Sequence, residues 1–550
     1  MVSQLKSSER TPTKNRYWPI PLKPWLFLLI AVLVIGIIFR FAHLDRKVFW
    51  LDEVKASYKI SGYEYVEYQQ MFYGQIISPE DFQKYGYPNP ESTIGDTVRI
   101  LTQEDSKHVP LYFIILRLWV DNLGNSIAVI RSLSAVLSLL AIPCMYWLCL
   151  ELFNSLLAGA IGAALIAISP FFILYAQEAR PYSLWTATIL LSSWFLLRAI
   201  RLPNKFNWGL YALSLILSIY THILSILVVI GHGIYVLCTQ GLRLNKALVA
   251  YSITVVISFL AFSPWLQFII LNQEELSDSV EWHSIIISLS SLINWWIINL
   301  SRLFFDVDST YNIETDFSSF QNPLSISLIA ALLVLVGYSI YHLIRYGNPK
   351  TRWFILTIVA IPALALAIPD IFTNGIRSTA ARYIVPSYIG IYLSVTYLIS
   401  NQISSQSNKA WKQKLWVLIV VFLIGSGVFS CGFISPQITW WNKYMSSELP
   451  QIAKIINQAK QPLVVIDRSG WSQDNGLSLS YLLDSNVRLQ LLAERNLSEI
   501  PKDFQDIFLF APSKDLLNKI KQKQEFKLKS ISPIVFPSTN LFQVYLIQAN

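Results

Sequence analysis

Long apolar stretches separated by short polar segments make up most of this 550-residue chain. A helix needs roughly 20 mostly apolar residues to cross the hydrocarbon core of a bilayer. The pattern predicts about eleven such helices and therefore a polytopic α-helical membrane protein. The predicted spans lie near residues 24–41, 126–150, 156–175, 182–198, 208–220, 222–243, 248–271, 323–345, 352–369, 383–400 and 415–433.

Two further apolar segments are predicted to lie at the membrane surface rather than to cross it. Residues 108–124 are too short and too often interrupted by polar residues to span. Residues 283–305 are apolar enough, but one more crossing would invert the side on which every later basic loop lies. Both segments are therefore expected to be interfacial.

Basic residues give the chain its orientation, because loops rich in Lys and Arg stay in the cytoplasm. Residues 1–23 are predicted to be a cytoplasmic tail, and residues 24–434 a membrane module whose long loop 44–125 is external. The inner loops carry Arg198, Arg201, Lys205, Arg243, Lys246, Arg345, Lys350, Arg352, Lys409, Lys412 and Lys414. The net charge of +9 thus reflects multi-pass topology in a plasma membrane, and no nucleic-acid partner is predicted.

Residues 435–550 have the composition of a soluble domain, and the topology places them outside. Predicted strands are PLVVID (462–467), VRLQLL (487–492), DIFLF (506–510) and LFQVYLI (541–547), and SKDLLNKIKQKQ (513–524) is a predicted helix. We expect a small external α/β domain. The cysteines, Cys144, Cys149, Cys238 and Cys431, lie in or beside apolar spans, so no disulfide framework is expected.

Trp50, Asp52 and Glu53 stand in the first external loop, directly after the first span. Adjacent carboxylates beside a membrane are unfavourable unless they are solvated, paired or used, and an ordinary solvated loop is the alternative to a functional pair. The topology favours function, because it gathers other unusual polar residues on the same outer face. These residues are His108, Glu178, Arg180, Tyr182, His222, Arg377 and Arg382.

The turn at 176–181 can be predicted in detail. Arg180 precedes Pro181, and a residue before proline avoids helical geometry, so one helix should end before Arg180. Pro181 suits the start of the next helix. Helix N-termini attract anions, and a guanidinium group binds phosphate oxygens through two parallel hydrogen bonds. Arg180 and Arg382 are therefore candidate phosphate ligands, with interfacial snorkelling as the alternative for both and for Arg377.

Carboxylates close to phosphate-binding arginines at the outer surface suggest group transfer from a lipid phosphate. One carboxylate would accept the proton of an acceptor hydroxyl as that oxygen attacks an anomeric carbon. The arginines would stabilise the departing phosphate. We expect Asp52 to be the base, and Glu53 to orient the acceptor or to pair with a cation.

The remaining candidates have weaker signals. Trp50 and Tyr182 could stack on a sugar ring, although aromatic residues at a membrane interface more often serve as anchors. His108 and His222 could donate hydrogen bonds or bind a divalent cation. Two isolated histidines on separate loops are a weak metal signal, so no metal site is predicted and no cofactor is required.

At these residues the sequence resembles a known family. WLDE (50–53), HVPLYF (108–113) and SPFFILYAQEARPYSLW (169–185) are similar to motifs of the dolichyl-phosphate-mannose–protein mannosyltransferases. This family belongs to the GT-C class of polyprenyl-phosphate-sugar glycosyltransferases, which includes the lipid A aminoarabinose transferases. YTH (220–222), SPW (263–265) and ARYIVPSY (381–388) are similar to its bacterial branch. The resemblance covers roughly residues 20–400.

The resemblance implies a GT-C-like fold, inversion at the anomeric carbon, a polyprenyl-phosphate-linked sugar as donor and a lipid, glycan or protein as acceptor. In the family an acidic residue of the first loop activates the acceptor, and this residue corresponds to Asp52. The aminoarabinose transferases carry an Asp near 177–182, where this chain has Glu178 and Arg180. A soluble sugar-binding insertion of the eukaryotic kind is not seen, which disfavours a eukaryotic-type protein acceptor.

Two other functions stay open at the level of sequence. A transporter of lipid-linked sugars would predict charges in the middle of spans and internal repeats. The notable charges here lie at the outer ends of spans, and the sequence shows no convincing repeat. A membrane glycan polymerase or ligase that uses pyrophosphate-linked oligosaccharides would share the arginines, but it would not need the carboxylate pair of the first loop.

Overall fold

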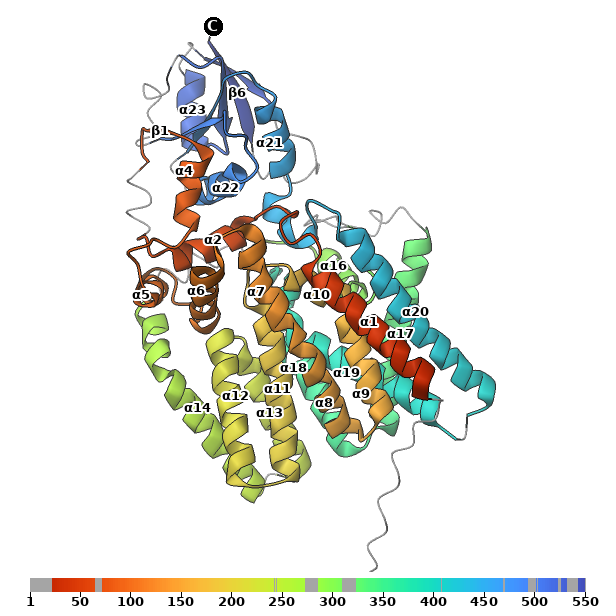
Figure 1. Cartoon of the computed structure of the whole chain (residues 1–550). Coiled ribbons are helices and arrows are strands. Elements are labelled where there is room, and N and C mark those ends of the chain that lie inside the picture. Colours follow the sequence, from red (N-terminus) through yellow and green to blue (C-terminus); the bar gives the residue numbers. More distant parts are fainter. Residues whose placement is uncertain are drawn as a thin grey trace, which may run out of the picture.

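The structure is a computed structural model that describes residues 22–549 except 65–71, 242, 244, 273–284, 309–322, 407, 468–469, 493–500, 502, 523–525 and 532–542. Long helices form one body, and a smaller unit with a β-sheet lies at one end of it (Figure 1). The long body contains α1 (Leu22–Phe41), α7 (Ile127–Leu139), α8 (Ala141–Phe153), α9 (Leu156–Ala167), α10 (Pro170–Ala176), α11 (Tyr182–Arg201), α12 (Lys205–Thr221), α13 (Ser225–Gln240), α14 (Lys246–Leu271), α17 (Pro323–Tyr346), α18 (Pro349–Thr373), α19 (Val385–Ser404) and α20 (Ala410–Ile434).

Shorter elements connect the long helices or form the smaller unit. The connecting helices are α2 (Leu51–Ser61), α4 (Pro79–Gln83), η1 (Lys84–Gly86), α5 (Ile94–Glu104), α6 (Leu111–Leu123), α16 (Leu289–Ser301), η4 (Arg377–Thr379), η5 (Ala381–Ile384) and η6 (Trp441–Ser446). The smaller unit contains α21 (Leu449–Asn457), α22 (Gly470–Ser480) and α23 (Lys514–Gln522). The strands are β1 (Ile76–Ile77), β2 (Pro462–Ile466), β3 (Arg488–Leu491), β4 (Asp506–Phe510), β5 (Phe526–Ser530) and β6 (Val544–Ala549).

Every predicted span corresponds to a helix or a helix pair of the long body. Within the described residues, seven helices are long and apolar enough to cross a membrane when α7 and α8 are counted as one (Ile127–Phe153), and the bent pair α9–α10 would be an eighth. Residues Leu26–Phe41 of α1 and helix α13 form shorter apolar stretches, and α12 has 17 residues. The chain is a multi-pass membrane protein, and its exact number of crossings stays a prediction.

The third predicted span consists of two helices rather than one. The sequence predicted a continuous helix at 156–175, but α9 ends at Ala167 and α10 begins at Pro170, with a bend of 55° between them. Pro170 has no backbone N–H to continue the helix. The carbonyl oxygens of Ile166 and Ala167 instead accept hydrogen bonds from the buried guanidinium of Arg40 in α1. Arg40 thus satisfies backbone groups that the break exposes.

Helices α6 and α16 are the two apolar segments that were predicted not to cross. Each contains 13 residues. At 1.5 Å per residue such a helix is about 20 Å long, which is less than the roughly 30 Å of a hydrocarbon core. Their lengths therefore agree with the prediction that neither segment spans.

A six-stranded sheet in the order β1-β3-β2-β4-β6-β5 forms the centre of the C-terminal unit. Strand β2 pairs in parallel with β3 and β4, and the other pairs are antiparallel. The four predicted strands are found as β2, β3, β4 and β6, and the predicted helix as α23. Strand β1 was not predicted, because two residues carry no periodic pattern. It comes from the first loop and pairs with β3, so the sheet joins that loop to the C-terminal unit.

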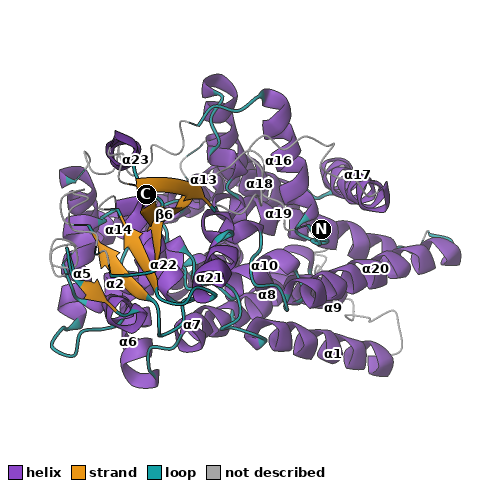
Figure 2. Ribbon diagram, turned by 90° about the horizontal axis from the view of Figure 1, so that it is seen from above, coloured by secondary structure: helices purple, strands orange, loops and turns teal. Residues whose placement is uncertain are grey.

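Further contacts hold the first loop against η6 and the C-terminal unit. The backbone N–H of Leu51 donates to Oγ of Ser446 at 3.2 Å, and Nε2 of Gln83 donates to the carbonyl oxygen of Ser480 at 2.9 Å. Seen from above, α2 and α22 lie on the same side of the molecule as the sheet (Figure 2). The carboxylates of the first loop are therefore carried by a helix that packs between the long helices and the C-terminal unit.

Candidate active site

Asp52, Arg180 and Arg382 come together from three segments that are far apart in the sequence. One Nη2 atom of each arginine lies 3.9 Å from Oδ2 of Asp52. Nη1 of Arg180 also donates to the backbone carbonyl oxygen of Asp52 at 3.3 Å. The side chains of Asp52, Arg180 and Arg382 are 17%, 7% and 12% exposed, so the group is enclosed but reachable from solvent. We call these three residues the charged centre.

The local sequence explains how two members of the charged centre are held. Helix α2 begins directly after Trp50, and Asp52 and Glu53 lie in its first turn, where free N–H groups favour acidic side chains. The turn predicted around Arg180 is confirmed, because α10 ends before it and Pro181 is the N-cap residue of α11. Arg180 is therefore fixed between the ends of two helices.

The pKa of Asp52 reflects two opposed effects. Burial alone would raise this pKa, but the charges of Arg180 and Arg382 outweigh burial and lower it to about 2. The carboxylate is therefore ionised throughout the physiological pH range. A separation of 3.9 Å is longer than a hydrogen bond, so the two ion pairs are loose.

His108 supports Arg180 within the site. Nε2 of the imidazole lies 3.0 Å from Nη2 of Arg180, and Nδ1 lies 2.9 Å from Oδ1 of Asp105. Because a guanidinium group can only donate, Nε2 must accept and Nδ1–H must donate to Asp105. Burial lowers the pKa of His108 to about 3, so the ring is neutral. Both ring nitrogens are occupied, which favours the predicted hydrogen-bonding role, here in orienting Arg180, over the alternative of metal ligation.

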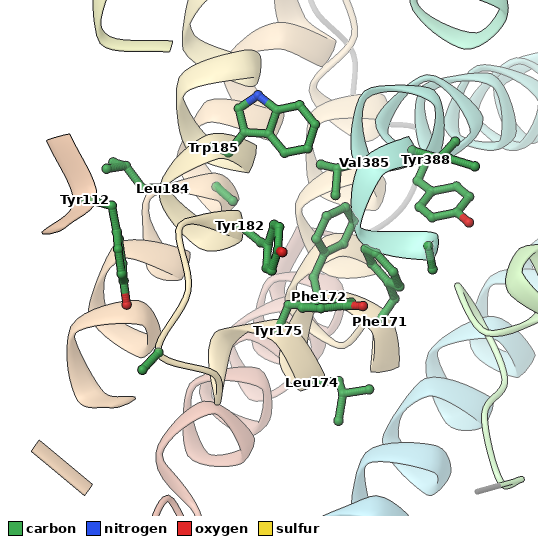
Figure 3. Close-up of a cluster of buried hydrophobic side chains, with 14 of the residues drawn as sticks. Tyr112, Phe171, Phe172, Leu174, Tyr175, Tyr182, Leu184, Trp185, Val385 and Tyr388 are labelled. Atoms are coloured by element: carbon green, nitrogen blue, oxygen red, sulfur yellow. The ribbon is translucent and has the colours of Figure 1, made fainter. Parts of the chain in front are cut away.

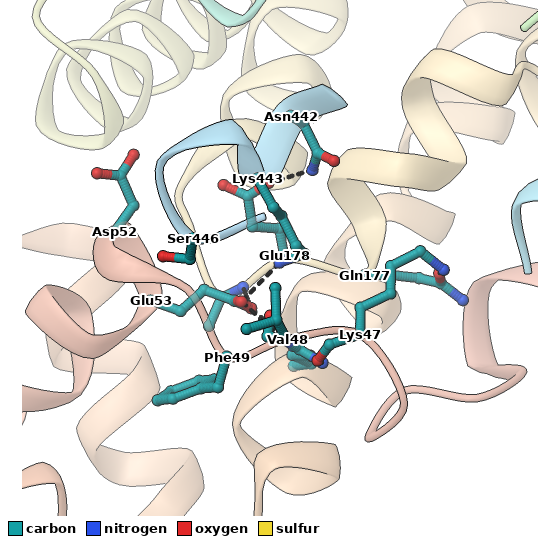
Figure 4. A network of polar contacts seen from close by, with 12 residues as sticks. Lys47, Val48, Phe49, Asp52, Glu53, Gln177, Glu178, Asn442, Lys443 and Ser446 are labelled. Carbon is teal, nitrogen blue, oxygen red and sulfur yellow. Dashed lines mark hydrogen bonds and ion pairs between the residues drawn. The ribbon is translucent and has the colours of Figure 1, made fainter. Parts of the chain in front are cut away.

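Glu53 points into a buried network instead of toward the charged centre (Figure 4). Oε1 accepts from Nε of Arg131 at 2.7 Å and from the N–H of Ala179 at 3.0 Å. Oε2 accepts from Nη2 of Arg131 at 2.7 Å and from Nζ of Lys443 at 2.6 Å. Burial would raise the pKa of Glu53, but the two cations lower it to about 2. Of the two roles predicted for Glu53, the structure favours pairing with cations.

Glu178 is a third carboxylate, and it is fully buried beside this network. Its Oε2 accepts from Nδ2 of Asn442 at 2.8 Å, while Oε1 has no hydrogen-bonding partner among the described residues. Burial raises the pKa of Glu178 to about 7, although the charge of Lys443 opposes this rise. Glu178 is therefore partly protonated near neutral pH, in contrast to Asp52.

Tyr182 and His222 lie on the apolar side of the site. Tyr182 belongs to a buried aromatic cluster together with Tyr175 and Trp185 (Figure 3). The imidazole of His222 stacks on Trp185, with ring centroids 4.1 Å apart and an angle of 18° between the planes. Its centroid is 6.1 Å from that of Tyr182. Both residues thus pack against other aromatic side chains.

Trp50 is fully buried between two cations. Its ring lies 5.9 Å from Cζ of Arg382 and 5.7 Å from Nζ of Lys443. Cations near an aromatic face are attracted by the negative charge of the π-system. This placement favours a role in positioning Arg382 over the sugar stacking that was predicted for Trp50.

Residues 107–268 match the sequence model of the dolichyl-phosphate-mannose-protein mannosyltransferase family. No curated protein matches the sequence. Among solved structures, ArnT from Cupriavidus metallidurans bound to undecaprenyl phosphate is similar, with a TM-score of 0.50 and 12% identity over 96% of this chain and 98% of that chain. The apo state of the same protein gives a TM-score of 0.50 and 12% identity over 95% and 98%. The chain has the GT-C fold.

A third similar structure is the archaeal oligosaccharyltransferase AglB from Archaeoglobus fulgidus in complex with an inhibitory peptide and a dolichol-phosphate. It has a TM-score of 0.48 and 12% identity over 96% of this chain and 74% of that chain. The GT-C fold confirms the predicted fold class, and the family match confirms the resemblance that the motifs predicted. Together they support a membrane transferase.

The matched segment contains only part of the site of this GT-C protein. His108, Arg131, Glu178, Arg180, Tyr182 and His222 lie within residues 107–268. Trp50, Asp52, Glu53, Arg382 and Lys443 lie outside that range. The charged centre is thus assembled from the matched segment, the first loop and η5, which directly precedes α19.

The structure does not bring Arg377 to the charged centre. Nη1 of Arg377 lies 3.4 Å from Oδ1 of Asp370 and 3.2 Å from the hydroxyl oxygen of Thr373, both at the end of α18. The same carboxylate accepts hydrogen bonds from the N–H and hydroxyl of Ser378. Arg377 therefore closes the turn after α18, and the grouping of Arg377 with Arg382 that the sequence suggested is not found.

Arg131 and Lys443 are charged residues that sequence reasoning missed. Arg131 had a signal, because an ionisable residue inside the predicted span 126–150 is unfavourable unless it is paired. It is fully buried and binds Glu53 through two hydrogen bonds. Lys443 had no such signal in the sequence, because it lies after the last predicted span in a segment without a recognisable motif.

Proposed function

We propose that this membrane protein transfers a sugar from a polyprenyl-phosphate donor to an acceptor hydroxyl, with inversion at the anomeric carbon. The observation that carries the proposal is the placement of Asp52 beside Arg180 and Arg382. The reaction needs a base for the hydroxyl and cations for a phosphate, and the charged centre contains both. The family match and the GT-C fold support the same class of reaction.

Asp52 is the base in the proposed reaction. As Asp52 accepts the hydroxyl proton, the acceptor oxygen forms a bond to the anomeric carbon, and the bond from that carbon to the phosphate oxygen breaks. The electron pair leaves with the polyprenyl phosphate, and Arg180 and Arg382 stabilise the added negative charge. A phosphate is a weakly basic leaving group, so it departs without needing a proton.

Donor binding would prepare Asp52 for this role. In the free protein the arginine charges keep the pKa of Asp52 at about 2, which makes the carboxylate a weak base. A phosphate bound to Arg180 and Arg382 would neutralise their charge. Burial would then become the dominant influence and raise the pKa of Asp52. The acceptor would therefore be activated only when the donor is in place.

The neighbouring residues would hold this geometry. His108 orients Arg180 through a hydrogen bond of 3.0 Å, and Trp50 packs near Arg382. Glu178, with an unpartnered oxygen and a raised pKa, would offer a hydroxyl group to a substrate when it is protonated. Arg377 has no part in the proposed reaction.

The reaction would take place on the external face of the plasma membrane. The basic inner loops favour that orientation, because positive loops stay in the cytoplasm. Pairing of β1 with β3 supports a common side for the first loop and the C-terminal unit. A lipid, a glycan and a protein all offer hydroxyl groups that fit the proposed chemistry.

Acceptor-dependent release of polyprenyl phosphate tests the proposal. The purified protein in detergent is incubated with isolated cell-envelope fractions and either polyprenyl-phosphate sugars or polyprenyl-pyrophosphate oligosaccharides. Mass spectrometry then measures the freed lipid phosphate and the glycosylated product. We expect turnover with the monophosphate donors. Turnover with the pyrophosphate donors alone would overturn the proposal and assign a polymerase or ligase.

A further inference from the structure

A lysine from the segment after the last long helix lies inside the buried network. Lys443 belongs to η6, which follows α20 and leads into the C-terminal unit. Its side chain is 1% exposed, and Nζ lies 2.6 Å from Oε2 of Glu53, which is itself fully buried. Burying an ammonium group is strongly unfavourable unless it is paired, so this position is under a specific constraint.

Glu53 is connected to both sides of the charged centre. It is the neighbour of Asp52 in the first turn of α2. Its Oε1 accepts from the backbone N–H of Ala179 at 3.0 Å, and Ala179 is the neighbour of Arg180. Glu53 therefore links the backbone next to Asp52 to the backbone next to Arg180.

Lys443 and Arg131 together hold that carboxylate. Arg131 donates to both oxygens of Glu53 from α7, and Lys443 donates to Oε2 from η6, 390 positions after Glu53. Lys443 also lies 5.7 Å from the ring of Trp50, whose ring is 5.9 Å from Cζ of Arg382. Lys443 thus contacts two residues beside the charged centre. Glu53 lies next to Asp52 and binds Ala179 beside Arg180, and Trp50 lies near Arg382.

We propose that Lys443 is a positioning residue for the transfer reaction, and that through it the C-terminal segment sets the spacing between Asp52 and the two arginines. This inference rests on the proposed function. Lys443 acts through Glu53 and Trp50 and does not contact the reacting groups. Its loss should therefore slow the chemical step more than it weakens donor binding, whereas a purely stabilising role would change only the amount of folded enzyme.

The experiment compares Lys443→Met, Lys443→Gln, Lys443→Arg, Glu53→Gln and the double variant Glu53→Gln/Lys443→Met with the wild type. The control is Gln83→Leu, which removes a different contact between the first loop and the C-terminal unit, the 2.9 Å hydrogen bond to Ser480. For the monodisperse fraction of each protein, kcat and the donor KM are measured with polyprenyl-phosphate sugar in detergent. Normalising to folded protein separates catalysis from stability.

We expect Lys443→Met to lower kcat about tenfold or more, as for the loss of a hydrogen bond to a charged group, with a smaller change in donor KM. Lys443→Arg should recover part of the loss because it restores the charge, and Gln83→Leu should keep the wild-type kcat. The double variant should lose less kcat than the product of the losses in Glu53→Gln and Lys443→Met, because both residues act on the same spacing.

A wild-type kcat per folded molecule in Lys443→Met would overturn the positioning role while leaving the proposed function intact. Equal losses in Gln83→Leu and Lys443→Met would also overturn it, since any loosening of the C-terminal unit would then suffice. If Lys443→Met does not fold, Lys443→Gln decides by the same comparison of kcat, because it removes the charge but keeps an amide that can donate to Glu53, whose carboxylate stays paired with Arg131. Absence of transfer by the wild type is the separate result that overturns the proposed function.

Discussion

Arg180 reaches Asp52 in two ways. Its Nη2 lies 3.9 Å from the carboxylate Oδ2, and its Nη1 donates to the backbone carbonyl oxygen at 3.3 Å. The backbone contact fixes the guanidinium beside the start of α2, and the longer contact leaves its charge available to another anion. An arginine held in this manner can exchange a loose carboxylate partner for a phosphate without moving its backbone.

Substitution of Arg180 should weaken donor binding. Arg180→Ala removes a charged hydrogen-bond donor, and such a loss is worth about 1.5–3 kcal/mol, or roughly 10- to 150-fold in affinity. Arg180→Lys keeps the charge without the two-pronged geometry, so it should retain an intermediate affinity. Titration of each detergent-solubilised protein with polyprenyl phosphate measures the effect. An unchanged Kd for polyprenyl phosphate in Arg180→Ala would contradict phosphate binding by Arg180, and would leave it only its contacts with His108 and Asp52.

The acid limb of the pH profile should move when Arg382 is replaced. Arg382 is one of the charges that lower the pKa of Asp52 to about 2. Activity is lost as pH falls through the pKa of the base, so Arg382→Gln should raise the pH at which kcat/KM declines. The matched control is Arg377→Gln, whose partner Asp370 lies outside the charged centre. A shift of the same size in both variants, or in neither, would contradict the assignment of Arg382.

Glu178→Gln should keep most of its activity at pH 6. The pKa of Glu178 is raised to about 7, so its carboxyl group is mainly protonated at that pH and an amide resembles it in shape. Asp52→Asn under the same conditions should lose activity severely, because Asp52 is the proposed base. Initial rates for the two variants at pH 6 give the comparison. A loss in Glu178→Gln as large as that in Asp52→Asn would make Glu178 a participant in proton transfer.

The first loop and the C-terminal unit should be labelled from the same side of the membrane. Glu91 of the first loop and Lys514 at the start of α23 are both exposed, so both positions are suited to labelling. We expect Glu91→Cys and Lys514→Cys, each in a Cys238→Ser background, to react with a membrane-impermeant maleimide on intact cells. Labelling of only one of the two positions would contradict both the predicted topology and the pairing of β1 with β3.

Local effects explain which parts of the site could be predicted from the sequence. The end of one helix before Arg180 and the start of the next at Pro181 follow from the geometry that proline imposes on its neighbours. The break before Pro170 had a similar signal, but the unbroken apolar run concealed it. Apolar run lengths were enough to locate every long helix, because span length is set by the bilayer.

Contacts between distant residues could not be predicted in the same way. Glu53 and Lys443 are 390 positions apart, and their pairing depends on how the C-terminal segment folds back over α2. The sequence also could not show that Asp52 and Glu53 lie in different surroundings. Adjacent residues on a helix point about 100° apart, and the sequence does not say which direction is buried. In the folded structure, Glu53 faces Arg131, whereas Asp52 faces Arg180 and Arg382.

The measurement that tests the account most directly is the turnover of Asp52→Asn with a polyprenyl-phosphate sugar, compared with its affinity for that donor. Asparagine keeps the size of the side chain but cannot accept the proton, so kcat should fall by about 10²- to 10⁴-fold. Donor affinity should persist or increase, because Arg180 and Arg382 lose the carboxylate that competes with the phosphate. Folding of the variant is checked by its thermal melting. A correctly folded Asp52→Asn protein that transfers sugar at the wild-type rate would contradict the assignment of Asp52 as the base.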